Sequence, residues 1–191
     1  MIRSRTRTSL RRVGYRRPSA TVSALLVAAT AAIAVLIAPA SASANNDPHR
    51  MFLAATPFDL PASFCGFPVH EEFPVNKEYA TVSTGADGST IFKITGSLFI
   101  SLTNTETGKT ITVNASGPGT TTFSADGTTA TFDARGVGVY FATNLTQFGF
   151  PSNLVLASGP SLATVDLVNN TVISAARVPH VLLDICAALS S

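Results

Sequence analysis

The chain has 191 residues and a formal net charge of +2, but the two signs of charge are unevenly distributed. Seven arginines lie among the first 17 residues, and all eleven acidic residues lie after residue 46, so residues 45–191 carry a net charge of −5. The six cations of this part are scattered and form no basic stripe, which argues against a nucleic-acid partner. Only 13% of the residues are charged, and Thr, Ser, Gly, Val and Phe are plentiful, which favours strands over helices.

The first 44 residues have the three parts of a secretory signal peptide in the expected order. An arginine-rich head is followed by the apolar run ALLVAATAAIAVLI at 24–37 and then by the small residues Ala42 and Ala44. A membrane-spanning helix needs about 20 apolar residues, so this run is short for an anchor. We therefore expect cleavage near Ala44 and a secreted, extracellular protein with no stable membrane span. Two arginine pairs in the head leave open whether export follows the general or the twin-arginine route.

Residues 45–63 show no hydrophobic period and are interrupted by three prolines. We expect a flexible N-terminal arm here, although Phe52, Leu53 and Phe58 could dock on the domain. The remaining residues, 64–191, suffice for a single β-rich domain with its own core.

The stretch FCGFPVHEEF at 64–73 places three consecutive ionisable side chains on the first expected strand. If the neighbouring valines face the core, Glu71 is carried inward, where its pKa would rise and it could act as an acid or base or grip a ligand. The alternative is that Pro68 and Pro74 break the strand or introduce a bulge, which would leave Glu71 at the rim in water. We favour this alternative, because the sequence places no second ionisable residue on an inward face.

From residue 66 onwards, alternating polar and apolar residues are separated by turn sequences. These are GADGS at 85–89, NTETGK at 104–109, SGPG at 116–119, SADGT at 124–128, SGPS at 158–161 and VNN at 168–170. Each contains Gly, Asn or Asp, which tolerate a positive φ. The period of two between them is typical of half-buried strands, as at 92–102 with Gly96 in its middle. We expect an all-β fold, an antiparallel barrel or sandwich of about eight to ten short strands.

The loop NLTQFGFPSN at 144–153 is unusually aromatic. Phe148 and Phe150 could form the lip of a pocket for an apolar ligand or a partner. They could instead fold back and plug the end of the domain, and we favour this second interpretation.

The hydrophobic pattern changes at the C-terminus. Leu182, Ile185, Cys186 and Leu189 fall at i, i+3, i+4 and i+7, on one face of a helix. The pattern predicts a short helix over 180–189, with Pro179 well placed to start it.

The chain has two cysteines, Cys65 and Cys186. In an exported protein such a pair is expected to form a disulfide. The bond would close a loop of about 120 residues and stabilise the fold by at most roughly 4 to 5 kcal/mol. A reactive Cys65 thiol with His70 as its base is the weaker alternative, because no third partner is in view.

Other chemical motifs are missing from the sequence. The three histidines are far apart and lack ligand spacing, so no metal site is predicted. The sequence has no nucleophile elbow, phosphate-binding loop or dinucleotide fingerprint, and we expect no cofactor.

Three segments together resemble a known group of proteins. CGFPV at 65–69, SLTNTETGKTITVNASGPGT at 101–120 and LLDICAAL at 182–189 are similar to small secreted actinobacterial β-rich proteins of unknown function. The group shares a CGFPV start, a TN-x-x-TGK-x-x-x-VN-x-SGPG hairpin and a C-terminal cysteine. The resemblance implies export, a β domain and the bridge between Cys65 and Cys186, and it transfers no catalytic residue.

Two classes of function stay open. The first is a non-enzymatic extracellular module that binds an apolar small molecule, a cell-envelope component or a protein, with Glu71, Phe148 and Phe150 lining its site. The second is a small isomerase-type or cyclase-type enzyme with an apolar cavity and Glu71 as its acid or base. A roomy cavity holding a desolvated Glu71 would favour the enzyme, whereas an interior filled by phenylalanines would favour the first class, which we choose.

Overall fold

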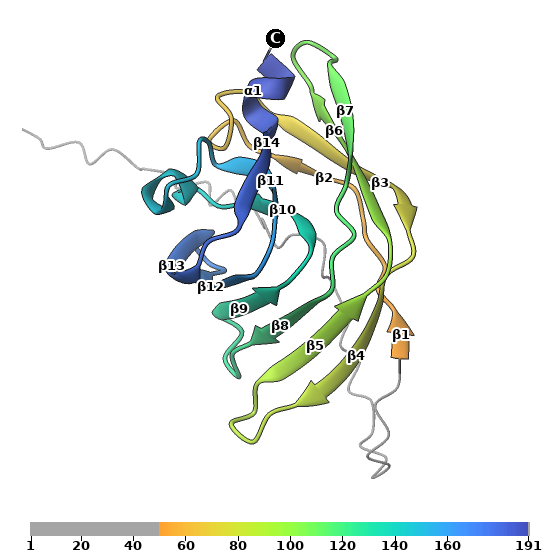
Figure 1. Ribbon diagram of the computed structural model, residues 1–191, viewed down its shortest axis with the longest axis vertical. Helices are drawn as coiled ribbons and strands as arrows, with labels where there is room; N and C mark the ends of the chain where they lie inside the picture. Colours follow the sequence, from red (N-terminus) through yellow and green to blue (C-terminus); the bar gives the residue numbers. More distant parts are fainter. Residues whose placement is uncertain (1–49, 191) are drawn as a thin grey trace, which may run out of the picture.

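A computed structural model describes residues 50–190, and its fold is all-β, as the sequence predicts (Figure 1). Within these residues, fourteen strands form three antiparallel sheets, followed by one short α-helix near the C-terminus. The sheets face one another like the layers of a sandwich and do not close into a barrel. The predicted signal peptide at 1–44 lies outside the described residues.

The largest sheet has seven strands in the order β1-β4-β5-β8-β9-β12-β13. Their bounds are Arg50–Phe52, Tyr79–Thr84, Thr90–Thr95, Gly119–Phe123, Thr129–Ala134, Ser161–Asp166 and Thr171–Arg177. The four-stranded sheet β2-β3-β6-β7 comprises Phe58–Leu60, Val69–Asn76, Leu98–Asn104 and Thr110–Asn114. The three-stranded sheet β10-β11-β14 comprises Val137–Phe141, Leu154–Ser158 and His180–Asp184. The 3-10 helix η1 spans Leu145–Phe148, and the α-helix α1 spans Ile185–Ser190.

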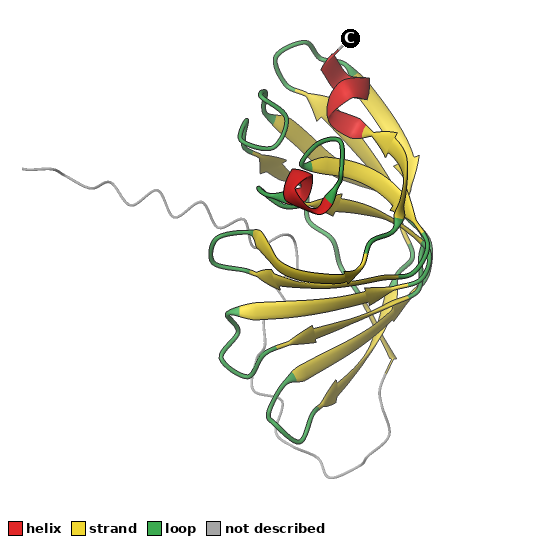
Figure 2. Ribbon diagram, turned by 60° about the vertical axis from the view of Figure 1, so that its left-hand side comes forward, coloured by secondary structure: helices red, strands yellow, loops and turns green. Residues whose placement is uncertain are grey.

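Six long strands cross from one sheet to another, which is why fourteen strands are found where eight to ten were expected. β3 runs into β4, β5 into β6, β7 into β8, β9 into β10, β11 into β12 and β13 into β14, with two to four residues at each break. The sequences SGPG at 116–119 and SGPS at 158–161, predicted as turns between strands, lie at such breaks. Figure 2 shows the strands bending together along one side of the molecule.

Hydrogen bonds join neighbouring breaks into a line across the sheet. The amide of Lys77 donates to the carbonyl of Ser97 at 2.8 Å, and the amide of Gly159 donates to the carbonyl of Gly136 at 3.2 Å. A Cβ atom on Gly136 would lie 2.5 Å from Cα of Gly117, so the two backbones can approach only because both residues are glycine. The breaks therefore lie side by side at one level, and the long strands bend together where they pass from one sheet to another.

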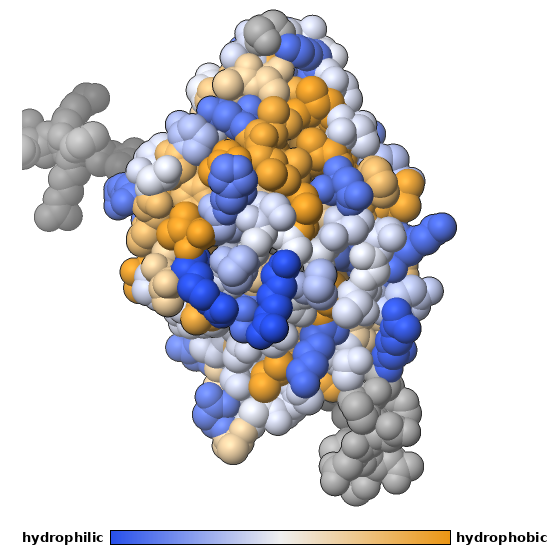
Figure 3. Space-filling model, in the orientation of Figure 1, coloured by the Kyte–Doolittle hydropathy of each residue, from blue (hydrophilic) through white to orange (hydrophobic). Residues whose placement is uncertain are grey.

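The two small sheets separate at this level. β8 pairs with β9 below it. Above it, among the described strands, β7 pairs only with β6, and β10 pairs only with β11. Figure 3 shows apolar surface concentrated in the upper half of the same view, around β6, β7 and β14. Helix α1 packs against strands of both small sheets and covers part of the split.

The predicted C-terminal helix is correct only in its second half. Residues 180–184 form β14, which pairs with β11, and Leu182 is 51% exposed. Ile185, Cys186 and Leu189 are buried, as the helical pattern predicts. Strand pairing overrides the helical period at the start of the segment because it satisfies the backbone groups next to β11.

The disulfide between Cys65 and Cys186 is present, with 5.0 Å between the two Cα atoms. It joins the segment before β3 to the first turn of α1. The surrounding core contains Leu60, Leu154 and Leu189, each at most 1% exposed. No helix in residues 50–190 is long and apolar enough to cross a membrane.

Residues 50–63 are not a free arm, contrary to the expectation for 45–63. β1 pairs with β4 and β2 pairs with β3. The Phe58 ring lies 6.2 Å from the ring of Phe141, measured between centroids, and Leu60 lies in the core. Residues 50–63 therefore belong to the β-rich domain, which begins no later than Arg50. The sequence hid this because strands of three residues are too short to show a period.

Candidate functional site

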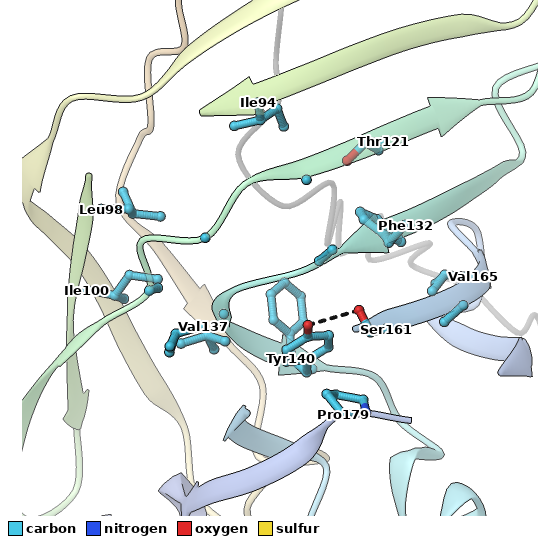
Figure 4. Close-up of a pocket in the computed structure, with 18 of the residues that line it drawn as sticks. Ile94, Leu98, Ile100, Thr121, Phe132, Val137, Tyr140, Ser161, Val165 and Pro179 are labelled. Atoms are coloured by element: carbon cyan, nitrogen blue, oxygen red, sulfur yellow. Dashed lines mark hydrogen bonds between the residues drawn. The ribbon is translucent and has the colours of Figure 1, made fainter. Parts of the chain in front are cut away.

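A cavity of about 460 Å³ lies inside the curved sheets and is lined by residues from all three of them and from η1 (Figure 4). Its wall is mostly apolar and includes Ile94, Leu98, Phe132, Val137 and Val165. A volume of this size matches cavities that enclose drug-sized small molecules.

The interior is hollow because one row of the seven-stranded sheet carries small residues. Gly119 pairs with Ala134, and Ala134 pairs with Ser161. Directly paired residues of antiparallel strands point to the same face. Three neighbouring strands therefore present almost no side-chain volume at this level, and the space becomes the cavity.

Glu71 lies on the inner face of β3, and the prediction that it lies at the rim in water is wrong. It pairs with Phe58 on β2 and Leu102 on β6, so two apolar side chains flank it on the same face. Only 2% of the residue is exposed, and it lines the cavity. Pro74 does accompany a bulge, but the bulge falls between Glu72 and Val75, after Glu71, and leaves the direction of Glu71 unchanged.

Burial controls the protonation of Glu71. Desolvation raises the pKa of its carboxyl from 4.5 to about 7, because the charged form is unfavourable in apolar surroundings. Its Oε2 atom has no hydrogen-bond partner among the described residues. The neutral acid, which can donate a hydrogen bond, is therefore well populated near pH 7.

Phe148 and Phe150 fold inward from the loop at 144–153 and line the same cavity as Glu71. Phe150 is 8% exposed and packs in a cluster with Leu145 and Val155. The side-chain nitrogen Nδ2 of Asn144 donates to the backbone carbonyl of Val172 at 2.9 Å. The backbone amide of Val172 donates to Oδ1 of Asn144 at 2.8 Å. These two bonds hold the start of the loop against β13.

Several polar groups of the cavity wall were not predicted from the sequence. The hydroxyls of Tyr140 and Ser161 are hydrogen-bonded at 3.0 Å (Figure 4). The side-chain nitrogen Nδ2 of Asn170 is buried and has no hydrogen-bond partner among the described residues. Glu78 is a second carboxyl on the wall, and burial raises its pKa. Glu78 corrects the expectation that no other ionisable residue faces inward. Ser161 and Asn170 lie in sequences that were interpreted as turns, and Glu78 lies in a strand break, so periodicity gave no signal for them.

The other candidates near Glu71 have no part in the cavity. His70 points to the opposite face of β3, where its Nδ1 lies 2.7 Å from Oδ1 of Asp59. This hydrogen bond raises the pKa of His70. Cys65 is held in the disulfide and cannot act as a thiol nucleophile. Among residues 50–190, no group of His, Cys, Asp and Glu side chains is arranged to hold a metal ion.

Comparison with known proteins gives no match. No protein-family model matches the chain, no curated protein sequence matches it, and no solved structure matches its fold. The resemblance to small actinobacterial secreted proteins stays a prediction. The proposed function therefore depends on the chemistry of the cavity.

Proposed function

We propose that the protein is a secreted binding protein for an apolar small molecule, which it encloses in the cavity between its sheets. One observation carries the proposal: the cavity of about 460 Å³ is mostly apolar but is lined by the buried Glu71, whose Oε2 atom has no hydrogen-bond partner in residues 50–190. Apolar walls supply affinity by removing hydrophobic surface from water, and a few polar groups fix orientation. Glu71, Phe148 and Phe150 belong to this site, and neither a cofactor nor a nucleic acid is part of the proposal.

The disulfide supports an extracellular location, because such bonds persist in oxidising compartments. Native mass spectrometry of protein from the culture medium tests this part. We expect a mass that starts after Ala44 and lacks two hydrogens. A mass that includes residues 1–44, or free thiols, would contradict it. A co-purified ligand would appear in the same spectrum.

Displacement of a neutral fluorescent dye, N-phenyl-naphthylamine, tests the binding site. We expect one dye per chain. Ala163, whose side chain lines the cavity, is replaced by leucine to narrow it, and the exposed Ala176 on β13 provides the matched control. Ala163→Leu should weaken dye binding at least about tenfold, a loss of about 1.4 kcal/mol, whereas Ala176→Leu should leave it unchanged. Equal binding by both variants would mean that the dye binds outside the cavity, which would contradict the proposal.

The desolvated Glu71 also favours a second candidate, an isomerase-type or cyclase-type enzyme. A carboxyl with a pKa of about 7 in an apolar cavity can exchange protons with a bound substrate near neutral pH. A roomy cavity that holds a desolvated Glu71 is the feature that the sequence analysis named as favouring an enzyme. The ligand recovered from the medium would be incubated with protein and followed by mass spectrometry. Conversion by the wild type that Glu71→Gln abolishes without weakening binding would establish this candidate.

A further inference from the structure

Two buried polar atoms lack a partner in residues 50–190, and both belong to residues of the cavity wall. They are Oε2 of Glu71 and Nδ2 of Asn170. Buried polar groups in folded proteins are nearly always hydrogen-bonded, so each exception calls for an explanation. Because both unpartnered atoms belong to residues that line one cavity, a single ligand could supply the missing hydrogen-bond partner of each.

The two groups come from opposite flanks of the fold. Glu71 lies on β3, which continues into β4 near one edge of the seven-stranded sheet. Asn170 ends the turn between β12 and β13, and β13 is the strand at the other edge. Figure 1 shows β3 and the β12–β13 pair on opposite sides of the molecule. A ligand that reached both groups would therefore extend across the cavity.

The turn alone does not account for Asn170. Its φ of 51° is positive, and asparagine tolerates this conformation, but glycine does so too. Its backbone carbonyl already accepts a hydrogen bond from the Thr143 amide at 2.9 Å. The backbone role is satisfied without the side chain, yet the amide nitrogen is turned into the protein and not into water.

Both groups offer hydrogen-bond donors. The Asn170 nitrogen donates, and Glu71 donates in its neutral form, which its apolar neighbours favour. Arg177 is the cation among the described lining residues, and its Nη2 lies 3.1 Å from Oδ1 of Asp133. Arg177 is therefore already paired with Asp133, which disfavours an anionic ligand.

We propose that the ligand is a neutral, elongated molecule with two acceptor groups of the carbonyl or ether type, one bound by the Glu71 carboxyl and the other by the Asn170 amide. This inference rests on the proposed binding function and adds the class of ligand and its orientation.

Three probes of equal chain length test it: a methyl ketone, the corresponding diketone with a carbonyl near each end, and the corresponding terminal diamine. The affinity of each probe is measured by its displacement of N-phenyl-naphthylamine, and the set of three is repeated at several chain lengths. At one length the diketone should bind about fivefold to tenfold tighter than the monoketone, the effect of one added hydrogen bond. Equal affinity at every length would overturn the inference and leave the proposed function standing. A diamine that binds tightest would also overturn it, since Glu71 would then act as an anion. Failure of the dye and all probes would remove the proposed function itself.

Variants assign the two ends. Asn170→Gly keeps the positive φ and removes the amide, so the diketone should lose its advantage over the monoketone. Asn169→Gly is the matched control, because the Asn169 side chain is exposed and bonds to Asp166. Glu71→Gln keeps a donor and should retain the advantage, whereas Glu71→Met should lose it. An advantage that survives both Asn170→Gly and Glu71→Met would overturn the inference.

The pH dependence gives an independent readout. Ionisation of Glu71 removes its donor, so diketone affinity should fall as the pH rises through about 7. The residues facing Glu71 from β2 and β6 are Phe58 and Leu102, both apolar, and Glu78 is the other carboxyl on the wall. Glu71→Gln should flatten the profile. A wild-type profile that is already flat would overturn the role of Glu71.

Discussion

The interior of this protein has two regions built on opposite principles. The region beneath α1 is filled by large side chains such as Leu154 and Ile185, both fully buried, and is joined to the segment before β3 by the disulfide. The region inside the seven-stranded sheet presents Gly119, Ala134 and Ser161 in one row and stays hollow. The same long strands pass through both regions. The difference teaches that side-chain volume, and not strand topology, separates the part that stabilises the fold from the part that can hold a ligand.

The largest expected effect comes from the closed region. Replacing Cys65 and Cys186 by alanine should lower the free energy of unfolding by up to about 4 to 5 kcal/mol, because the unfolded chain regains the freedom of a loop of about 120 residues. Urea unfolding followed by circular dichroism measures the change. Reductant should shift the wild type in the same direction and leave the double variant unaffected. Identical midpoints for all forms would contradict a stabilising bond.

A matched pair of isoleucines compares the two regions directly. Ile185→Ala, in the packed core, should cost about 3 to 4 kcal/mol, because a cavity would form among fully buried neighbours. Ile94→Ala, on the cavity wall, should cost only about 1 kcal/mol, because its side chain already borders empty space. Urea unfolding of both variants provides the test. Equal losses would mean that the sheet interior is as tightly packed as the core.

The stability of the wild type should depend on pH through Glu71. Its carboxyl ionises near 4.5 in the unfolded chain and near 7 in the folded protein. The folded state therefore binds more protons between these values, and the free energy of unfolding should fall by about 3 kcal/mol as the pH rises across this window.

Unfolding curves of wild type and Glu71→Gln from pH 4 to 8 isolate this effect. The hydrogen bond to Asp59 raises the pKa of His70, so this residue also loses its stabilising contribution as the pH rises above about 6.5, and Glu71→Gln leaves that contribution in place. Parallel curves for the two proteins would show that Glu71 is solvated.

The smallest expected effect comes from adding volume. Ala157→Leu, at a fully buried position of the cluster that contains Phe150, should cost about 1 to 3 kcal/mol through overpacking. Ala163→Leu should change stability by less than about 0.5 kcal/mol, because the cavity accepts the added methylenes. Thermal unfolding of the two variants measures this difference. A large loss for Ala163→Leu would argue against an open interior.

Local sequence signals succeeded where a residue's neighbours along the chain decide its structure. Period-two alternation predicted the strands, and the buried positions Ile185, Cys186 and Leu189 were recognised from helical spacing. Signals failed at the breaks. SGPG and SGPS have the composition of turns, and only the pairing of the flanking strands shows that the chain continues past them without reversing.

The candidate site was predicted in part. Glu71, Phe148 and Phe150 were singled out, and the structure brings all three to one cavity. The favoured position for Glu71 was wrong because the effect of Pro74 depends on where the bulge falls in the pairing with β6, which a single strand does not reveal. Asn170 and Ser161 were missed because each looks like an ordinary turn residue.

The sequence by itself determined the β-rich character of the domain, the pairing of its two cysteines and the residue types available to a ligand. Tertiary structure alone decided that Gly119, Ala134 and Ser161 line up across three strands, and that carboxyl and amide groups about 100 residues apart border one cavity. The physical reason is that alternation fixes the two faces of a strand, whereas register and curvature, set by long-range pairing, decide which face surrounds empty space.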